Sequence, residues 1–203
     1  MVARFTSYHR ASYICKTGLG DVMVGAAASV ASYNGAEHAS HIKDKLVEMT
    51  HLNETIYSSA VASAHEAKPL ASGIFINDQM LANVCKHNVT RFPYEISRLA
   101  QDLAGGLMVT MPSEADFNDE KTGPMLNKSL QGRSNLPVEV RQRMLRLIEN
   151  MTLGRNAVGY LTESLHGAGS PQAQRIQIQR GMDVEKKKGY AEDLAGIKIT
   201  DAD

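Results

Sequence analysis

Residues 40–60 read SHIKDKLVEMTHLNETIYSSA, and this stretch carries the clearest structural pattern of the chain. On a helix of 3.6 residues per turn, its regularly spaced apolar side chains lie roughly on one face. Strand-like alternation of apolar and polar residues is nearly absent from the rest of the sequence. We therefore predict an all-α fold, an antiparallel helix bundle. The apolar positions that carry the pattern are Ile42, Leu46, Met49, Ile56 and Ala60.

Capping residues and glycines set the expected limits of the helices. A first helix is expected to begin with Asp21 as its N-cap and to stop near Gly35. Asn77 or Asp78 should cap a third helix, which Pro93 is expected to kink or divide. The expected bundle helices cover residues 21–34, 40–68, 77–104, 136–153 and 156–166.

Two further segments are expected outside these helices. Residues 111–135 are rich in proline, glycine and polar side chains, which predicts a long loop before a helix capped by Asn135. Ser170-Pro171 is typical of an N-cap followed by a first helical residue. A charged last helix is expected at about 183–196. We expect one helical-bundle domain over residues 1–203.

The composition narrows the classes of function. Lys plus Arg equal Asp plus Glu at 22 each in 203 residues, so no net field favours nucleic acid or an anionic membrane. The longest nearly uninterrupted apolar stretch, 22–31, is far shorter than the ~20 residues of a membrane-spanning helix, and residues 1–10 lack the apolar region of a signal peptide. We expect a cytoplasmic protein. Its cysteines, Cys15 and Cys85, are then expected to serve thiol or metal chemistry rather than a disulfide.

The densest group of reactive side chains lies in residues 8–16, which read YHRASYICK. In a helix, His9 and Tyr13 are four residues apart and share a face. Cys15 beside Lys16 could act as a thiolate nucleophile or as a soft metal ligand. An ordinary first helix with a packed tyrosine and a buried cysteine explains the same residues. Spacing alone favours that second interpretation.

A second group lies in residues 163–172, which read ESLHGAGSPQ. Glu163 and His166 are three residues apart at the end of one expected helix, and glycines lead into the next. Gly167 and Gly169 would let a flat cofactor or a phosphate approach backbone N–H groups at a helix N-terminus. A plain helix-turn-helix connection needs the same glycines, so the residues alone do not separate the two.

Three weaker signals remain. Gly105-Gly106 could place backbone donors against a pyrophosphate, although a helix C-cap explains it as well. His38 and His41 have a spacing compatible with metal binding, yet no third ligand is nearby, and we interpret them as surface residues. Cys85 lies among apolar residues of an expected helix, which favours a packed thiol.

The same segments, in the same order, resemble the 4-hydroxybutyryl-CoA dehydratase and vinylacetyl-CoA isomerase family, within the 4-hydroxyphenylacetate 3-hydroxylase superfamily. The resemblance covers nearly the whole chain. It implies an acyl-CoA-dehydrogenase-like architecture in which this chain is the C-terminal helical bundle. The most specific segments are Tyr8-His9-Arg10 with Cys15-Lys16, ASHIKDKL at 39–46, NVCK at 83–86, NVTRFPYE at 88–95, MPSE at 111–114 and TESLHGAGSPQAQR at 162–175.

The resemblance also implies cofactors and site residues. Family members bind FAD between the subunits of a homotetramer and hold a [4Fe-4S] cluster by three cysteines and one histidine. By position, His9 and Cys15 would be cluster ligands, and His9 would also be the catalytic base. Here these two residues are one position closer than in the family pattern. Tyr13, Lys16 and Glu163 match positions that line the substrate and flavin, whereas Thr90, Arg91, Gly105 and Gly106 are weaker candidates for FAD contacts.

The implied reaction is the dehydration of 4-hydroxybutyryl-CoA to crotonyl-CoA, initiated by one-electron flavin chemistry because the proton on carbon 3 is not acidic. The other two cluster cysteines would belong to an N-terminal part, so we expect this chain to need a partner polypeptide. We also expect it to self-associate, because in related enzymes this bundle contacts neighbouring subunits. Two alternatives stay open. One is a relative of the flavin-dependent aromatic hydroxylases without a cluster, and the other is a non-catalytic helical assembly module.

Overall fold

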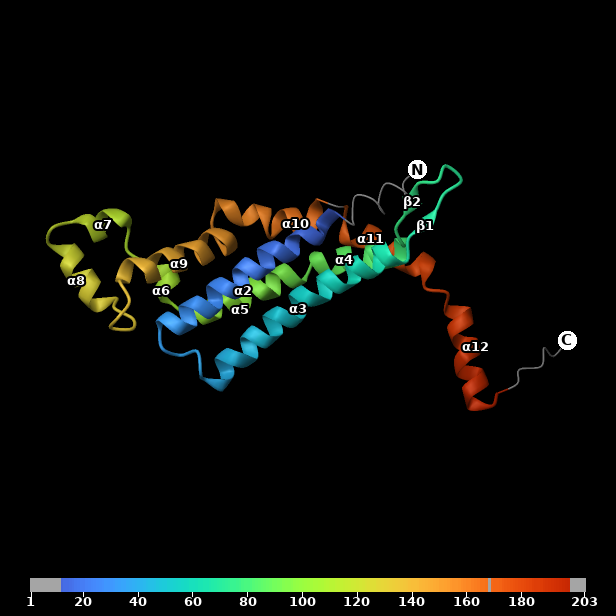
Figure 1. The fold of residues 1–203 in the computed structure, drawn as a ribbon, viewed down its shortest axis with the longest axis horizontal. Helices are drawn as coiled ribbons and strands as arrows, with labels where there is room; N and C mark the ends of the chain where they lie inside the picture. The colour runs from blue at the N-terminus through green and yellow to red at the C-terminus, as the bar shows by residue number, and fades with distance from the viewer. Residues whose placement is uncertain (1–11, 168, 198–203) are drawn as a thin grey trace.

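The computed structural model describes residues 12–167 and 169–197, and its secondary structure is almost entirely helical (Figure 1). The all-α prediction is confirmed. In chain order the elements are η1 (Ser12–Ile14), α2 (Cys15–Tyr33), α3 (Ser40–His65), β1 (Lys68–Pro69), β2 (Phe75–Ile76), α4 (Gln79–Val89), α5 (Phe92–Ala104), α6 (Leu107–Thr110), α7 (Glu114–Asn118), α8 (Thr122–Ser129), α9 (Val138–Thr152), η2 (Arg155–Gly159), α10 (Thr162–His166), α11 (Pro171–Gly181) and α12 (Val184–Ala195).

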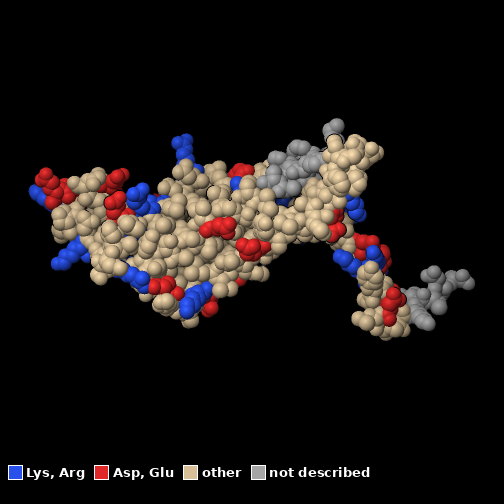
Figure 2. Space-filling view, viewed as in Figure 1, with Lys and Arg blue, Asp and Glu red and all other residues tan. Residues whose placement is uncertain are grey.

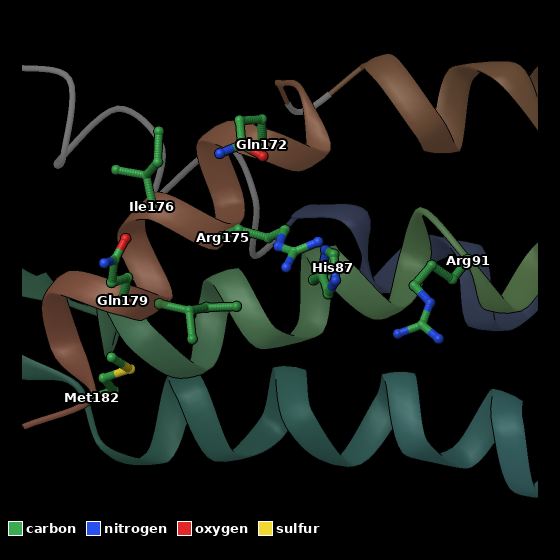
Figure 3. A pocket seen from close by; sticks show the side chains of 8 residues that line it. His87, Arg91, Gln172, Arg175, Ile176, Gln179 and Met182 are labelled. Carbon is green, nitrogen blue, oxygen red and sulfur yellow. The ribbon is translucent and has the colours of Figure 1, made fainter. Parts of the chain in front are cut away.

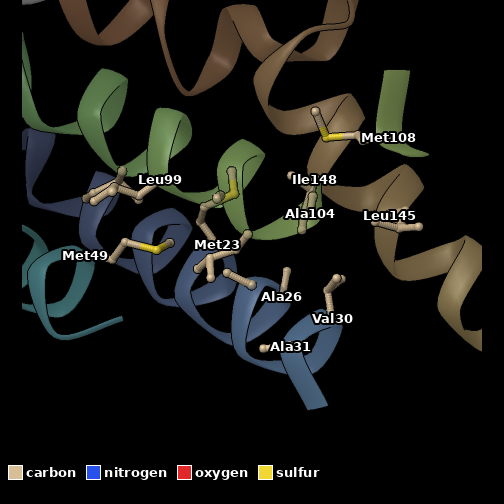
Figure 4. Close-up of a cluster of buried hydrophobic side chains, with 14 of the residues drawn as sticks. Met23, Ala26, Val30, Ala31, Met49, Leu99, Ala104, Met108, Leu145 and Ile148 are labelled. Atoms are coloured by element: carbon tan, nitrogen blue, oxygen red, sulfur yellow. The ribbon is translucent and has the colours of Figure 1, made fainter. Parts of the chain in front are cut away.

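The main core lies between α2, α3, α5 and α9 (Figure 4). Met23 of α2, Met49 of α3, Ile96 of α5 and Ile148 of α9 are fully buried in it. Burying one such side chain stabilises the fold by roughly 1.5–3 kcal/mol relative to leaving it exposed. The periodic apolar face of residues 42–60 points into this core and its neighbouring cluster, as the sequence pattern predicts.

The N-terminal half of α2 approaches α3 very closely. A Cβ atom at Gly20 would lie 2.6 Å from Cγ of Asn53, so this crossing requires glycine. Asn53 is buried, and its amide donates to the Thr17 carbonyl at 3.1 Å and to the Asp21 carboxylate at 2.8 Å. The prediction that Asp21 caps the first helix is wrong, because α2 begins at Cys15 and Asp21 lies inside it as a partner of Asn53.

The third expected helix is divided, as Pro93 indicates. Helix α4 begins after Asp78, whose carboxylate accepts a hydrogen bond from the Leu81 N–H at 2.8 Å. Helix α5 begins at Phe92 with Pro93 in its first turn, where a missing N–H removes no helical hydrogen bond. Gly105 ends α5, as expected.

The prediction of a long loop at residues 111–135 is wrong, because this segment contains the helices α7 and α8. Short polar side chains accept hydrogen bonds from backbone N–H groups at the start of both helices. Ser113 and Asp116 form a capping box at the start of α7, and Asp119 accepts from the Thr122 N–H at 2.8 Å at the start of α8. Pro137, not Asn135, holds the N-cap position of α9.

Two other expected elements also differ in detail. The helix expected at 156–166 is split into the 3-10 helix η2 and the short helix α10. The end of the expected helix at 40–68 is replaced by a small antiparallel hairpin, in which Lys68 pairs with Ile76. The sequence shows no alternation there, because two paired residues are too few to produce a pattern.

The last helix extends away from the bundle (Figure 1). Asp183 caps α12 by accepting from the Lys186 N–H at 3.2 Å, and Gly196 ends it in a left-handed conformation, as the sequence predicts. Helix α12 carries both acidic and basic side chains, and both kinds are interspersed on the visible face of the bundle (Figure 2). Across residues 12–167 and 169–197, no helix is both long and apolar enough to cross a membrane.

Candidate functional site

Two stretches far apart in the sequence, residues 13–16 and 159–163, meet at one end of the bundle. Tyr13 of η1 and Lys16 of α2 are both buried, and Glu163 of α10 lies against them. The Lys16 ammonium donates to the Glu163 carboxylate and to the Gly159 carbonyl, the latter at 2.5 Å. The sequence separates Lys16 from Glu163 by 147 positions. The structure therefore brings together the three catalytic candidates Tyr13, Lys16 and Glu163.

The electrostatics of this cluster keep the acid ionised and the phenol neutral. Burial raises the pKa of Glu163, but hydrogen bonds from Lys16 and Tyr13 and the charges of Lys16 and Lys86 outweigh it and hold that pKa below its usual value. Burial, together with the hydrogen bond to Glu163 and its negative charge, raises the pKa of Tyr13 to about 12. The Glu163 side chain is 41% exposed, so the carboxylate is accessible from outside the chain.

Gly167 leaves room for the Tyr13 hydroxyl. A Cβ atom at Gly167 would overlap that hydroxyl oxygen, and it would lie 2.8 Å from the carboxylate atom Oε1 of Glu163. Glycine is therefore required by contact with the Tyr13–Glu163 pair. The sequence suggests that Gly167 lets a cofactor or phosphate approach the backbone; in this structure its missing side chain makes space for Tyr13.

Lys86 is the member of this cluster that the sequence analysis did not propose. It is fully buried, and its ammonium lies 3.2 Å from the centre of the Tyr13 ring. The signal was present: Lys86 lies four residues after Ala82 and three before Val89, on the buried face of α4. A lysine is usually expected to point into solvent, even on an apolar helical face. Lys86 is instead fully buried.

The proposed metal ligands are only partly described. His9 lies outside the described residues. Cys15 is exposed at the first position of α2, directly after the 3-10 turn, so Tyr13 and Cys15 do not belong to one regular α-helix. Within 12–167 and 169–197 there is no group of three or more His, Cys, Asp or Glu side chains that could hold a metal ion. The described part of the chain thus offers Cys15 as a single thiol ligand.

The remaining cysteine and histidines fit the plain interpretations. Cys85 is fully buried, its thiol donates to the Ile56 carbonyl at 3.6 Å, and burial raises its pKa to about 11, partly offset by Lys86. A thiol of that kind is a packed core group. His38 and His41 are exposed.

The four candidate FAD contacts lie at two separate places. Thr90 is buried, and its hydroxyl donates to the His87 carbonyl at 2.7 Å, so it is already engaged in its own helix. Arg91 is exposed and lines a groove of about 690 Å³ between α4 and α11 (Figure 3). Gly105 and Gly106 are exposed at the end of α5, where an added Cβ atom would meet nothing within 4 Å.

The fold and this cluster define a helical-bundle domain that holds a hydrogen-bonded acid, phenol and ammonium at one end. The chain belongs to the family described as 4-hydroxyphenylacetate 3-hydroxylase, C terminal, whose model matches residues 1–196. The family resemblance inferred from the sequence motifs is confirmed.

Individual relatives narrow the comparison. The chain is 57% identical, over 98% of its length, to the 4-hydroxybutyryl-CoA dehydratase/vinylacetyl-CoA-Δ-isomerase of Clostridium aminobutyricum, and it spans 42% of that protein. It is 29% identical, over 68% of its length, to the 4-hydroxyphenylacetate 3-monooxygenase oxygenase component of Thermus thermophilus, of which the match covers 28%.

Solved structures of related proteins share this fold. An oxygen-tolerant archaeal 4-hydroxybutyryl-CoA dehydratase from N. maritimus superposes on all of the chain with a TM-score of 0.94 and 67% identity, and 40% of that structure is covered. A 4-hydroxyphenylacetate 3-monooxygenase oxygenase component solved with FAD and 4-hydroxyphenylacetate shares the fold, with a TM-score of 0.81 over 91% of the chain and 39% of its own length, at 24% identity. The chain thus spans about two fifths of the length of the dehydratases it matches.

Proposed function

We propose that this chain provides the C-terminal helical part of a 4-hydroxybutyryl-CoA dehydratase that also isomerises vinylacetyl-CoA. The observation that carries the proposal is the Tyr13–Lys16–Glu163 cluster, which joins two distant segments of a chain that is 57% identical to a protein of that name. The identity to the monooxygenase component is much lower, at 29%. The dehydratase is therefore favoured over the aromatic hydroxylase and over a non-catalytic module.

The isomerase step illustrates what these residues do. A base removes a proton from carbon 2 of vinylacetyl-CoA, the double bond moves to carbons 2 and 3, and an acid delivers a proton to carbon 4 to give crotonyl-CoA. Glu163 is ionised and accessible, so it can accept or return a proton. Lys16 fixes the carboxylate and Tyr13 donates a hydrogen bond to it. We propose His9 as a second base, in addition to Glu163.

The charges of the cluster suit an anionic reaction. The ammonium groups of Lys16 and Lys86 lie near one carboxylate, that of Glu163. Removing a proton beside a thioester carbonyl creates negative charge on the substrate, and preorganised positive groups stabilise such charge in a site with little water. An acyl-CoA thioester is therefore the substrate class that we propose.

The cofactors of the proposed enzyme are FAD and a [4Fe-4S] cluster. The described residues fit both in part: Cys15 is an exposed thiol next to the catalytic cluster, and Gly105 and Gly106 leave open space for a flat ligand. Thr90 does not fit, because its hydroxyl is buried and engaged. When bound, FAD supplies one-electron chemistry, and the iron–sulfur cluster supplies a Lewis acid for the leaving hydroxyl group. We propose that a partner polypeptide or further sequence supplies the other cluster cysteines.

The test is an anaerobic reconstitution. The chain is mixed with a polypeptide covering the part of the Clostridium aminobutyricum relative outside the match, then with FAD, iron and sulfide, and crotonyl-CoA is measured from both substrates. We expect flavin and iron–sulfur absorbance bands and activity. Glu163→Gln should lower the rate by roughly 100-fold or more, whereas Glu149→Gln, which breaks the Arg146–Glu149 pair on α9, should leave it nearly unchanged. Equal rates for the two variants would contradict the role of Glu163.

A further inference from the structure

Lys86 is the largest of the fully buried side chains in the part of the chain that the structure describes. Burying an ammonium group is unfavourable unless polar groups or counter-charges compensate it. A methionine or leucine would fill similar space on the apolar face of α4 without that penalty. The contacts of the ammonium group therefore indicate what its charge does there.

The Lys86 ammonium contacts Tyr13 itself and the backbone of the residue next to Glu163, so it lies beside both partners of the Tyr13–Glu163 hydrogen bond. The ammonium lies 3.2 Å from the centre of the Tyr13 ring, which is the geometry of a cation–π interaction. It also donates to the carbonyl of Ser164, the residue next to Glu163, at 3.0 Å. Ser164 is fully buried and its hydroxyl donates to the Tyr160 carbonyl at 2.5 Å, so this turn of α10 is held from two sides.

We propose that Lys86 is a positioning residue of the candidate site, one whose ammonium group holds the Tyr13 ring and the α10 backbone so that the phenol meets the Glu163 carboxylate. Three residues then determine the position of the Tyr13 side chain. Lys86 covers the face of its ring, Glu163 accepts a hydrogen bond from its hydroxyl, and Gly167 leaves room for the hydroxyl oxygen. The catalytic meaning of this role rests on the proposed function, but the geometric claim does not.

The charge of Lys86 has a second effect on the same pair. Among residues 12–167 and 169–197, the titratable groups that act on Glu163 are Tyr13 from η1, Lys16 from α2 and Lys86 from α4, with Cys85 beside Lys86. Both ammonium groups favour the ionised carboxylate. Lys16 bonds to it directly, whereas Lys86 acts through space and through the α10 backbone. Removing Lys86 should therefore change the ionisation of Glu163 without removing a direct partner of the carboxylate.

The first experiment uses NMR on the full chain labelled with ¹³C-lysine. A methylene group beside a ring face is shifted upfield, so the Hε protons of Lys86 should be shifted and should show contacts to the Tyr13 ring protons. Tyr13→Phe keeps the ring and should keep the shift, while Tyr13→Leu should abolish it. Lys86 signals at ordinary positions in the wild type would overturn the proposal, whether or not any Lys86 variant folds.

The second experiment follows the titration of the Glu163 side-chain carboxyl carbon, assigned by its loss in Glu163→Gln. Lys86→Met should raise the midpoint above that of the wild type, and Lys86→Arg, which keeps the charge, should restore it toward the wild-type value. Lys45→Met removes a lysine paired with Asp102 within the bundle and should have no effect. An unchanged midpoint in a folded Lys86→Met protein, or an equal rise in Lys86→Arg, would overturn the proposal.

The two proposals fail separately. The NMR measurements need neither cofactor nor substrate, so a confirmed ring contact with an inactive reconstituted enzyme would refute the proposed function and leave the positioning role intact. In an active reconstituted enzyme, Lys86→Met should lower kcat more than it changes KM, since Lys86 touches Tyr13 and α10 and is itself fully buried. Unchanged kcat would overturn the positioning role and leave the function standing.

Discussion

Different interactions hold the helices together at the two ends of the bundle. Around Met23, Val30 and Ile148, the contacts between α2, α5 and α9 are apolar and the side chains are completely buried (Figure 4). At the other end, a small apolar cluster that includes Ile56 and Val89 surrounds Tyr13, next to two ammonium groups and a carboxylate. Apolar burial stabilises a fold without fixing directions, whereas buried charges must be oriented and compensated.

This difference separates stability from chemistry. The apolar end can hold the helices together without the polar end, because its free energy comes from area removed from water. The polar end places a phenol, an acid and two lysines in fixed positions at a cost in desolvation. Substitutions at the apolar end should therefore change stability and leave the site's titration intact, whereas substitutions at the polar end should also change the titration of Tyr13 or Glu163.

The largest effect on stability is expected at the apolar end. Ile148→Ala should lower the free energy of unfolding by about 2–5 kcal/mol in denaturant titrations, because it leaves a cavity in a fully buried position. The titration midpoint of Glu163 should not move. Leu147, its neighbour on α9, is 37% exposed, and Leu147→Ala should cost clearly less. A Leu147→Ala protein less stable than Ile148→Ala would show that the core is elsewhere.

A smaller loss is expected at Gly167. The added methyl group of Gly167→Ala would overlap the Tyr13 hydroxyl, so Tyr13 must move and the fold should lose roughly 1–3 kcal/mol. Ultraviolet titration should show the phenol pKa of Tyr13 returning toward its ordinary value. Gly159→Ala is the control, because a Cβ atom there meets nothing within 4 Å. If both variants titrate like the wild type, Gly167 does not make space for Tyr13.

The alkaline limb of stability gives a third test. The pKa of Tyr13 is raised from 10.0 to about 12 in the folded chain, so folding favours the protonated phenol. Its contribution is complete below pH 10 and is lost as the pH rises toward 12, because the unfolded chain ionises first. The stability difference between wild type and Tyr13→Phe should therefore shrink across that range. Tyr160, also buried, is common to both proteins and cancels; a constant difference would argue against the raised pKa.

The smallest effect is expected in α12. Leu194 is 92% exposed on a helix that extends away from the bundle (Figure 1). Leu194→Ala should change the free energy of unfolding by no more than ~0.5 kcal/mol in the isolated chain. A loss comparable with that of Ile148→Ala would mean that α12 is covered by another molecule under the conditions of the measurement.

Sequence reasoning succeeded where the physical signal is local. The spacing of Ile42, Met49 and Ile56 predicts a helix face, and Asp78 and Asp183 act as the caps their positions indicate. It failed where a distant partner overrides the local preference. Asp21 is a good N-cap residue, but it lies inside α2, where its carboxylate accepts a hydrogen bond from the Asn53 amide of α3.

The sequence predicts only part of the candidate site, because some of its residues are brought together by distant contacts. Tyr13 and Lys16 lie in one group of reactive side chains and Glu163 in another, but only the family resemblance joined them into one site, because no spacing rule connects residues 147 positions apart. Lys86 carried a local signal, its place on the apolar face of α4, but lysine is so rarely buried that the pattern favoured the wrong environment. Its role depends on Tyr13 and α10, which only the folded chain brings together.

The titration of the Glu163 carboxyl group in the wild-type chain tests the account most directly. A carboxylate held by Lys16 and Tyr13 should titrate below the ordinary value of 4.5, and its midpoint should rise in Lys16→Met. The stabilisation from this pair should then be present above pH 4.5 and lost as the pH falls through the folded-state pKa. A wild-type midpoint at or above 4.5, unmoved in Lys16→Met, would contradict the claim that this end of the bundle holds an ionised acid for proton transfer.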